Sequence, residues 1–392
     1  MGTGERALNN HPESAPFDLT PHPSSSPSNF KLQTSASAAP TPDNNQPWRF
    51  DIHRDAFVIR LDRSRLLPSD VDGMFDLIGL GAALTNVYLA TAAAGQPTRI
   101  LIENADGHLV PPPSEISDYA GWEDEGELAA EIFKRHTNRR PYSTRPLTAA
   151  EREQLVSAAL PAVPGLERFR ITWLTRRPEI SRFAALVARC DRLRFEYPAF
   201  HAELFKQLRF GPEEAERTGD GLDVRTLELP PGGATFLSML RSWKAMQMFR
   251  AVGGTRLLAF PSRISVIRSG AVGLVSFGPS GGGDALSSEA PLESWRRDSL
   301  LTGAVFQRLW LKASRLGLAL QPLGSLPLFF ARINRLGGAG LTIQDQQAVR
   351  RLESRFQNLV PHLKGHTLGM AFRIGHARPP KYRSPRRSGF PA

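Results

Sequence analysis

One helix-like pattern occurs twice in this chain of 392 residues, at a constant offset of 222 positions. The first copy, Asp76 to Gly95, is rich in Ala and Leu with small residues between them, a composition that favours a buried helix packed closely against its neighbours. The matched pairs are Asp76 and Asp298, Gly81 and Gly303, Ala82 and Ala304, Leu89 and Leu311, and Gly95 and Gly317. The repeat predicts two related halves; a chance alignment of two apolar helices is the alternative.

The length allows a large core, in two or three domains or in one of double size. We find no uninterrupted apolar run long enough to span a membrane and no signal peptide, so we expect a cytoplasmic protein with no membrane partner. Cys190 is the only cysteine, which excludes an intrachain disulfide and makes a cysteine metal site implausible. We expect it to be a buried apolar thiol, and we expect no metal.

The net charge of +11 and the isoelectric point near 10.3 raise the possibility of nucleic-acid binding. The distribution of the charge argues against it, because the 42 arginines are scattered through every segment and outnumber the 7 lysines. A nucleic-acid-binding protein remains one alternative, which would require strongly salt-dependent binding.

The chain divides into three parts by composition. Residues 1–38 are rich in Pro, Ser and Asn and predict a disordered arm. A first half is expected at residues 39–124 and a second at residues 125–392, with an inserted lid at about 197–250.

The local patterns predict an α+β fold with a mixed β-sheet core. Helices are predicted at 76–95, 125–135, 178–195 and 298–317, and from the capping box Thr148 to Glu151. Strands are predicted at 48–52 and 57–61 as a hairpin, and at 98–102, 168–174, 264–267, 272–277 and 368–374.

The stretch from Ala39 to Trp48 combines turn residues, two amide side chains and an aromatic side chain. Prolines fix φ, Asp and Asn support Asx turns, and Asn44 and Gln46 supply neutral donors and acceptors together. Such a loop suits an uncharged heteroaromatic ring with imide edges; a polar turn that leads into a strand is the plainer alternative.

A second motif is the run from Arg135 to Tyr142. Arg135 and Arg139 lie four residues apart with Thr137 between them, so two guanidinium groups and a hydroxyl can converge on one phosphate. A solvated, arginine-rich helix end would give the same pattern.

Two further motifs follow in the second half. The run from Gly317 to Gly324 ends the repeated helix with a turn that contains Pro322, and Pro380 to Arg383 comes after the last predicted strand. A bare helix stop and a solvated basic tail are the respective alternatives.

Together these motifs resemble those of the FMN-dependent nitroreductase family. The Ala39–Trp48 loop is similar to the family's Ala-Pro-Ser-x-x-Asn-x-Gln-Pro-Trp, with Thr41 in place of Ser. The Arg135 motif resembles Arg-x-Ser-x-Arg, the Gly317 motif resembles Gly-Leu-Gly-x-x-Pro-x-x-Gly, and Lys381 and Arg383 resemble a C-terminal Lys-x-Arg pair. The resemblance covers roughly residues 39–390.

The resemblance implies noncovalently bound FMN. Arg135, Arg139, Lys381 and Arg383 would hold its phosphate, and Thr137 would support the ribityl end. Pro40, Thr41 and Asn44 would line the ring, with Gln46 fixing their loop, and Pro322, Leu323 and Gly324 would lie by the reactive edge. No side chain is expected to act as general acid or base, since flavin N5 would carry the chemistry.

The order of the motifs differs from that of an ordinary nitroreductase, in which the phosphate motif comes first and the partner subunit supplies the amide loop. Here the amide loop lies in the first half and the other motifs lie in the second. Each half lacks what the other supplies, as expected of a fused pseudo-dimer with one flavin site, an arrangement found in the tandem Acg-like branch of the family.

The resulting hypothesis is an oxidoreductase that transfers hydride between NAD(P)H and a small organic acceptor, as a pseudo-dimeric monomer or as a homodimer. The alternative is an FMN storage or sequestration protein with little turnover, because the insertion could cover the face on which a nicotinamide must stack.

Overall fold

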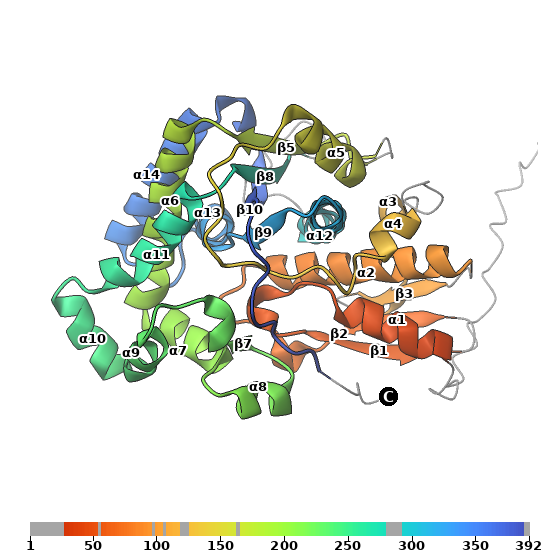
Figure 1. The fold of residues 1–392 in the computed structure, drawn as a ribbon, viewed down its shortest axis with the longest axis horizontal. Helices are drawn as coiled ribbons and strands as arrows, with labels where there is room; N and C mark the ends of the chain where they lie inside the picture. Colours follow the sequence, from red (N-terminus) through yellow and green to blue (C-terminus); the bar gives the residue numbers. More distant parts are fainter. Residues whose placement is uncertain are drawn as a thin grey trace, which may run out of the picture.

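A computed structural model describes residues 27–53, 56–95, 99–104, 107–117, 125–161, 165–279 and 292–387. In these ranges two four-stranded sheets lie on either side of two long, central helices, and a group of shorter helices extends from one edge (Figure 1). One large apolar core joins side chains from both sheets and both long helices. The predicted α+β class is confirmed.

The first sheet has the order β1-β2-β3-β4, with β1 Trp48–Ile52, β2 Phe57–Leu61, β3 Ile100–Glu103 and β4 Leu109–Val110. β1 and β2 pair antiparallel, with Trp48 opposite Leu61, so the predicted hairpin is confirmed. Trp48, Phe50 and Phe57 are buried, and the rings of Phe50 and Phe57 stack with centroids 5.6 Å apart. These aromatic side chains fix the register of the hairpin because a slip by one residue would expose them.

The second sheet has the order β5-β8-β10-β9, and all its pairs are antiparallel. Its strands are β5 Phe169–Leu174, β8 Ala271–Phe277, β9 Ala319–Pro322 and β10 Thr367–Gly375. The strand predicted at 264–267 is wrong, because these residues end helix α11 Thr255–Ile267. Its β-branched residues suggest a strand, but Ala259 and Val266 bury one helical face against a neighbouring helix.

The repeated pattern forms the two central helices, α2 Met74–Ala94 and α12 Leu292–Arg315. A Cβ on Gly81 would lie 1.9 Å from the carbonyl oxygen of Leu300, and a Cβ on Gly303 would lie 2.0 Å from that of Ile78. In the repeat, with its offset of 222 positions, Gly303 corresponds to Gly81 and Leu300 corresponds to Ile78. The two helices therefore cross by reciprocal contacts, and only glycine allows so close an approach.

α2 is the one helix in the described part of the chain that is long and apolar enough to cross a membrane. The protein itself covers 78% of its most apolar window, so its composition matches its place in the core.

The remaining helices confirm most of the predictions. Helix α5, Ala149–Ala159, starts at the capping box between Thr148 and Glu151. Helix α4, Glu125–Ala129, is shorter than predicted, since turns replace the helix after Ala129. Cys190 is a buried, free thiol on helix α6, Arg177–Glu196. The other helices outside the insertion are α3 Ser114–Ser117, α13 Ser325–Leu336 and α14 Ile343–Leu359.

The disordered arm predicted at residues 1–38 needs correction. Residues 1–26 lie outside the described residues, but helix α1 spans Pro27–Ser37 and packs on α2. Ser35 and Ala36 are buried, and the side-chain amide of Asn86 on α2 donates to the Ser35 carbonyl oxygen at 2.8 Å. Small side chains allow this helix to lie close to α2, so its low hydrophobicity is misleading.

The segment expected as an insertion has an apolar core of its own, built around Phe205, Leu208, Val224, Leu240 and Met246. It lies beside the start of α2 and the C-terminal segment (Figure 1). Its elements are α7 Pro198–Gln207, β6 Leu208–Arg209, α8 Pro212–Thr218, β7 Leu222–Asp223, α9 Gly233–Met239 and α10 Trp243–Ala251.

Candidate functional site

The loop from Pro40 to Trp48 adopts an uncommon backbone conformation. Asp43, Asn44 and Gln46 have φ values of +47°, +58° and +47°. Asp and Asn tolerate this left-handed region better than other non-glycine residues, whereas Gln rarely adopts it. Strain of this kind needs support from its surroundings and is concentrated at functional sites.

Hydrogen bonds from two distant segments provide that support. Asn44 Nδ2 donates to the carbonyl oxygens of Gly221 and Pro385, at 3.0 Å each, and Asn44 Oδ1 accepts from the Arg386 guanidinium. Gln46 Nε2 donates to the Gly219 carbonyl oxygen at 2.8 Å. The insertion and the C-terminal segment thus both close over the loop, and both N–H groups of the Asn44 amide are used within the protein.

Pro40, Thr41 and the turn after β9 pack on adjacent turns of α2. A Cβ on Gly79 would lie 3.0 Å from Thr41 Cγ2 and 3.3 Å from the Pro40 carbonyl oxygen. A Cβ on Gly324 would lie 3.5 Å from the ring of Phe75, one helical turn before Gly79. The start of α2 therefore brings the two predicted ring-contacting motifs together, although one lies near the beginning of the sequence and the other near its end.

Arg135 is buried in the interior. Its Nη2 donates to the Ala38 carbonyl oxygen at 2.6 Å, and its guanidinium lies over the Trp310 ring, 4.4 Å from the centroid. Its Nε is buried and has no hydrogen-bond partner among the residues that the structure describes. Burial, together with the positive charges of Arg386 and Arg383, holds the pKa of Arg135 well below its ordinary value.

Arg139 lies close to the same loop and makes one long hydrogen bond, from Nη1 to the Thr226 carbonyl oxygen at 3.4 Å. Burial lowers its pKa, while Asp43 and Tyr142 act against that shift. Arg373, on β10, lies over the Tyr142 ring with its guanidinium carbon 3.9 Å from the centroid. Burial lowers the Arg373 pKa to about 10. Several cations are thus held in a region where few carboxylates balance them.

Backbone pairing places the arginine motif beside β9. Asn138 N donates to the Leu320 carbonyl oxygen at 3.0 Å, and Asn138 Nδ2 donates to that of Arg378 at 2.9 Å. Pro322 is two residues beyond Leu320 on the same strand, and Leu323 N donates to the Ala371 carbonyl oxygen at 2.7 Å. The sequence predicted a turn that contains Pro322, but Pro322 ends strand β9, because it pairs with Phe372 on β10. The arginine motif, the end of β9 and the C-terminal segment are therefore neighbours.

The predicted C-terminal pair, Lys381 and Arg383, lies at the surface of the protein. Lys381 is exposed and, like the half-buried Thr137, forms no hydrogen bond or ion pair within the described ranges. Arg383 is also exposed, with Nη1 donating to the Phe133 carbonyl oxygen at 3.2 Å. Arg386 instead contacts Asn44 and has its pKa lowered to about 10 by burial. Sequence reasoning missed Arg386, although the cluster of arginines after Pro380 could have drawn attention to it.

A buried acidic pair anchors the other side of the loop. Asp76 Oδ1 accepts from Asn45 Nδ2 at 3.0 Å, and Asp70 accepts from the backbone N–H groups of Phe75 and Asp76, each at 2.9 Å, at the start of α2. Burial raises the pKa of Asp76 to about 6, and burial with the nearby Asp76 charge raises that of Asp70 to about 8. The helix start that supports the loop is therefore sensitive to pH.

Replacing Asp76 with Asn should reduce the pH dependence of stability. The folded pKa is raised above the ordinary value of 3.8, so between about pH 4 and pH 6 the native state binds more protons than the unfolded state, and the free energy of unfolding falls as pH rises. Asn removes this loss while it can still accept from Asn45. Urea denaturation at pH 5 and pH 8 should show a smaller fall for Asp76→Asn than for the wild type.

Asp62→Asn is the matched control of opposite sign. Hydrogen bonds from Ser64 and Arg49 lower the pKa of Asp62 despite its burial, so its stabilising contribution is present at pH 8 and is lost on acidification. This control should lose stability at pH 8. If the stability of Asp76→Asn depends on pH as that of the wild type does, Asp76 does not have a raised pKa in the folded protein.

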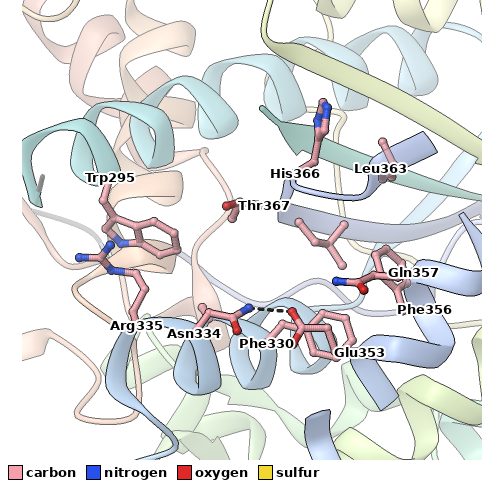
Figure 2. Close-up of a pocket in the computed structure, with 12 residues that line it drawn as sticks. Trp295, Phe330, Asn334, Arg335, Glu353, Phe356, Gln357, Leu363, His366 and Thr367 are labelled. Carbon is pink, nitrogen blue, oxygen red and sulfur yellow. Dashed lines mark hydrogen bonds between the residues drawn. The ribbon is translucent and has the colours of Figure 1, made fainter. Parts of the chain in front are cut away.

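One enclosed cavity lies elsewhere, between α12, α13, α14 and β10 (Figure 2). Trp295, Asn334, Arg335 and Glu353 are among its lining residues, and Asn334 Nδ2 donates to Glu353 Oε1 at 2.7 Å. The cavity offers about 20 Å³ to water, room for roughly one molecule. The cavity is too small for a flavin, and none of the predicted site residues lines it. It is therefore not the candidate site. Within the described ranges no group of His, Cys, Asp or Glu could hold a metal ion.

Comparison with known proteins gives relatives but no matching family model. An uncharacterized protein of Mycobacterium tuberculosis, MT1398, is 28% identical over 356 residues, which cover 89% of this chain and 46% of the relative. The putative NAD(P)H nitroreductase acg of M. tuberculosis H37Rv is 30% identical over 176 residues, 43% of this chain and 50% of the relative. The chain thus spans about half the length of each relative. The match to acg confirms the resemblance to the nitroreductase family.

The chain also matches solved structures of proteins described as nitroreductases or flavoproteins, at low sequence identity and low TM-score. Nitroreductase A from Vibrio parahaemolyticus is 12% identical with a TM-score of 0.35, over 66% of this chain and 71% of that one. A BluB-like flavoprotein from Clostridium difficile is 16% identical with a TM-score of 0.35, over 67% and 94%. A nitroreductase with bound FMN from Bacteroides fragilis is 11% identical with a TM-score of 0.32, over 64% and 89%.

Proposed function

We propose that this relative of the nitroreductases is an FMN-dependent oxidoreductase that transfers hydride between NAD(P)H and a small organic acceptor. The observation that carries the proposal is the buried Arg135 guanidinium. Within the described part of the chain its Nε has no hydrogen-bond partner, and its charge lies near those of Arg383 and Arg386. A buried cation without a counter-ion is costly, and a bound phosphate monoester would relieve that cost.

The residues present fit the phosphate end of FMN. Arg135 supplies a buried guanidinium group and Arg386 a half-buried one, and Arg139, four residues after Arg135, has only one weak hydrogen bond in the described structure. Arginine offers several N–H donors in a planar fork that matches phosphate oxygens. In this proposal Arg386 takes a larger share of the phosphate than the exposed Lys381 and Arg383, and Thr137 keeps its place beside the ribityl chain.

At the ring end, Pro40 and Thr41 from the first half and Pro322 to Gly324 from the second would contact the flavin near the start of α2. When bound, FMN supplies two-electron chemistry at N5, and the protein positions the reactants and excludes water. Gln46 would hold the loop through Gly219, as its hydrogen bond suggests. Both N–H groups of the Asn44 amide already donate to carbonyl oxygens of the protein. Asn44 can donate to the ring only if the Pro385 segment moves; if that segment stays in place, Asn44 holds the loop in position.

The reciprocal crossing of α2 and α12 supports the proposal that the halves form a fused dimer. In a two-fold dimer, residue i of one copy contacts residue j of the other while j contacts i. Gly81 on Leu300 and Gly303 on Ile78 repeat that pattern within one chain. Each of the flavin-related motifs occurs once in the sequence, the amide loop in the first half and the others in the second, so this proposal has one flavin site per chain, assembled from both halves. A cytoplasmic location and a monomer or homodimer are part of the same proposal.

Storage of FMN with little turnover is the second candidate, favoured by one observation. The insertion at Gly219 and Gly221 and the C-terminal segment at Pro385 and Arg387 hydrogen-bond to the amide loop from outside. A site enclosed in this way would restrict the approach of a nicotinamide.

Anaerobic addition of NADPH or NADH to the FMN-loaded protein separates the two candidates. An oxidoreductase should rapidly lose the visible absorbance of its oxidised flavin, and an added acceptor should restore it. A flavin that dithionite reduces but neither nicotinamide reduces would favour storage.

A further inference from the structure

Exposed apolar side chains are concentrated in one segment of the chain. Seven of the twelve large hydrophobic side chains that are exposed in the described ranges fall between positions 236 and 264. Single exposed hydrophobic residues are ordinary, whereas a concentration of them marks an interaction surface. The seven are Phe236, Met239, Met248, Val252, Leu257, Phe260 and Ile264, with exposed fractions from 36% to 82%.

Helix α11 carries the clearest part of this surface. Leu257, Phe260 and Ile264 occur at positions i, i+3 and i+7, so they lie on one face of the helix. They are 68%, 55% and 36% exposed. The opposite face packs on α6 through Ala259 and Val266. α11 is therefore an amphipathic helix whose second apolar face has no partner in the described structure.

α9 and α10 extend the same surface. The Phe236 ring on α9 contacts the Phe249 ring on α10, with centroids 5.4 Å apart, and a Cβ on Gly254 would touch the Phe249 ring just before α11 begins. α9 and α10 lie at one edge of the molecule, and α11 runs from that edge toward the second sheet, where its Ser265 carbonyl oxygen accepts from Arg373 on β10 (Figure 1). We call the exposed apolar residues of these helices the apolar edge.

The segment that carries the apolar edge has charges of one sign. From Leu229 to Gly270 the sequence contains no Asp or Glu but six basic residues. All six are exposed and form no ion pair within the described ranges, and Arg241, Lys244, Arg256 and Arg263 lie on or next to the three helices of the apolar edge. Apolar residues set among unpaired cations complement a surface that is anionic outside and apolar beneath, which describes an acidic lipid bilayer.

We infer that the apolar edge docks this protein on anionic membranes, with Leu257 and Phe260 inserted among the acyl chains and the four cations against lipid phosphates. The absence of an apolar span in the sequence suggested no membrane partner, but peripheral docking requires none. A neutral protein surface would not need the charges, and a polyanion such as nucleic acid would not need the apolar side chains. This inference is independent of the proposed flavin chemistry.

Flotation with lipid vesicles tests the inference on the full chain. At low ionic strength the protein should float with vesicles of phosphatidylcholine that contain phosphatidylglycerol as the minor component, and it should remain unbound with pure phosphatidylcholine. Leu257→Ser with Phe260→Ser should weaken binding by at least about tenfold. Arg241, Lys244, Arg256 and Arg263 changed together to Gln should weaken it by about fivefold per residue.

Matched controls lie on α14, where Ile343 is 73% exposed and Arg351 and Arg355 are exposed. Ile343→Ser and Arg351→Gln with Arg355→Gln should leave binding unchanged, and circular dichroism should show all variants folded. Equal binding to neutral vesicles, or no binding to anionic ones, would overturn the inference. So would a dimer that the serine variant converts to a monomer without any vesicle binding, which would assign the edge to a second copy of this chain.

Discussion

Replacing Arg135 and Arg139 together with Gln should weaken FMN binding by roughly 3–6 kcal/mol, since each charge-assisted hydrogen bond contributes about 1.5–3 kcal/mol. That corresponds to a loss of affinity of roughly 100-fold to 10,000-fold. Quenching of flavin fluorescence on titration with the apoprotein measures this affinity directly.

The stability of the apoprotein gives a second readout, from the single variant Arg135→Gln. The Arg135 pKa is lowered chiefly by burial, so its charge is unfavourable without an anion. We therefore expect the apo form of Arg135→Gln to be at least as stable as the wild type while FMN binding is lost. Arg182→Gln and Arg351→Gln, on exposed helix surfaces, are controls that should change neither quantity. Unchanged FMN affinity in the double variant would move the phosphate site elsewhere.

Gly81→Ala and Gly303→Ala should each destabilise the protein by more than about 4 kcal/mol, which is exceptional for one substitution. The added Cβ would lie 1.9 Å from the Leu300 carbonyl oxygen or 2.0 Å from that of Ile78, and backbone on both sides leaves no flexible atom to move aside. Because the crossing is reciprocal, the two losses should be similar. Urea denaturation of both variants provides the comparison.

Gly126→Ala is the control for helix propensity. Gly126 also lies in a helix, but a Cβ there would meet nothing within 4 Å, so alanine should stabilise it by up to about 1 kcal/mol. A protein that tolerates alanine at 81 or 303 as it does at 126 would contradict the close crossing of α2 and α12.

The sequence predicted the parts of the fold that local patterns determine. The hairpin of β1 and β2, the capped start of α5 at Thr148 and the two repeated helices carry their signals within a few residues. Errors arose where packing overrides propensity. Ile264 to Ile267 resemble a strand but continue α11, and α1 is polar in sequence yet lies against α2 through small residues.

The candidate site was predictable as a set of motifs and not as a set of contacts. Motifs from opposite ends of the sequence could be grouped through the family resemblance, and the start of α2 does bring Thr41 and Gly324 near each other. The hydrogen bonds of Asn44 to Gly221 and Pro385 depend on where two long segments end in space. For the same reason Arg386 could not be preferred over Lys381 and Arg383 from sequence alone.

The flavin content of the purified protein tests the central claim most directly, because two halves that share one site must hold one flavin per chain. Denaturing a weighed, FMN-saturated and gel-filtered sample and quantifying the released flavin by chromatography gives both its identity and its ratio to protein. We expect FMN at one molecule per chain. FAD, two FMN per chain, or a colourless protein that does not take up added FMN would contradict the account.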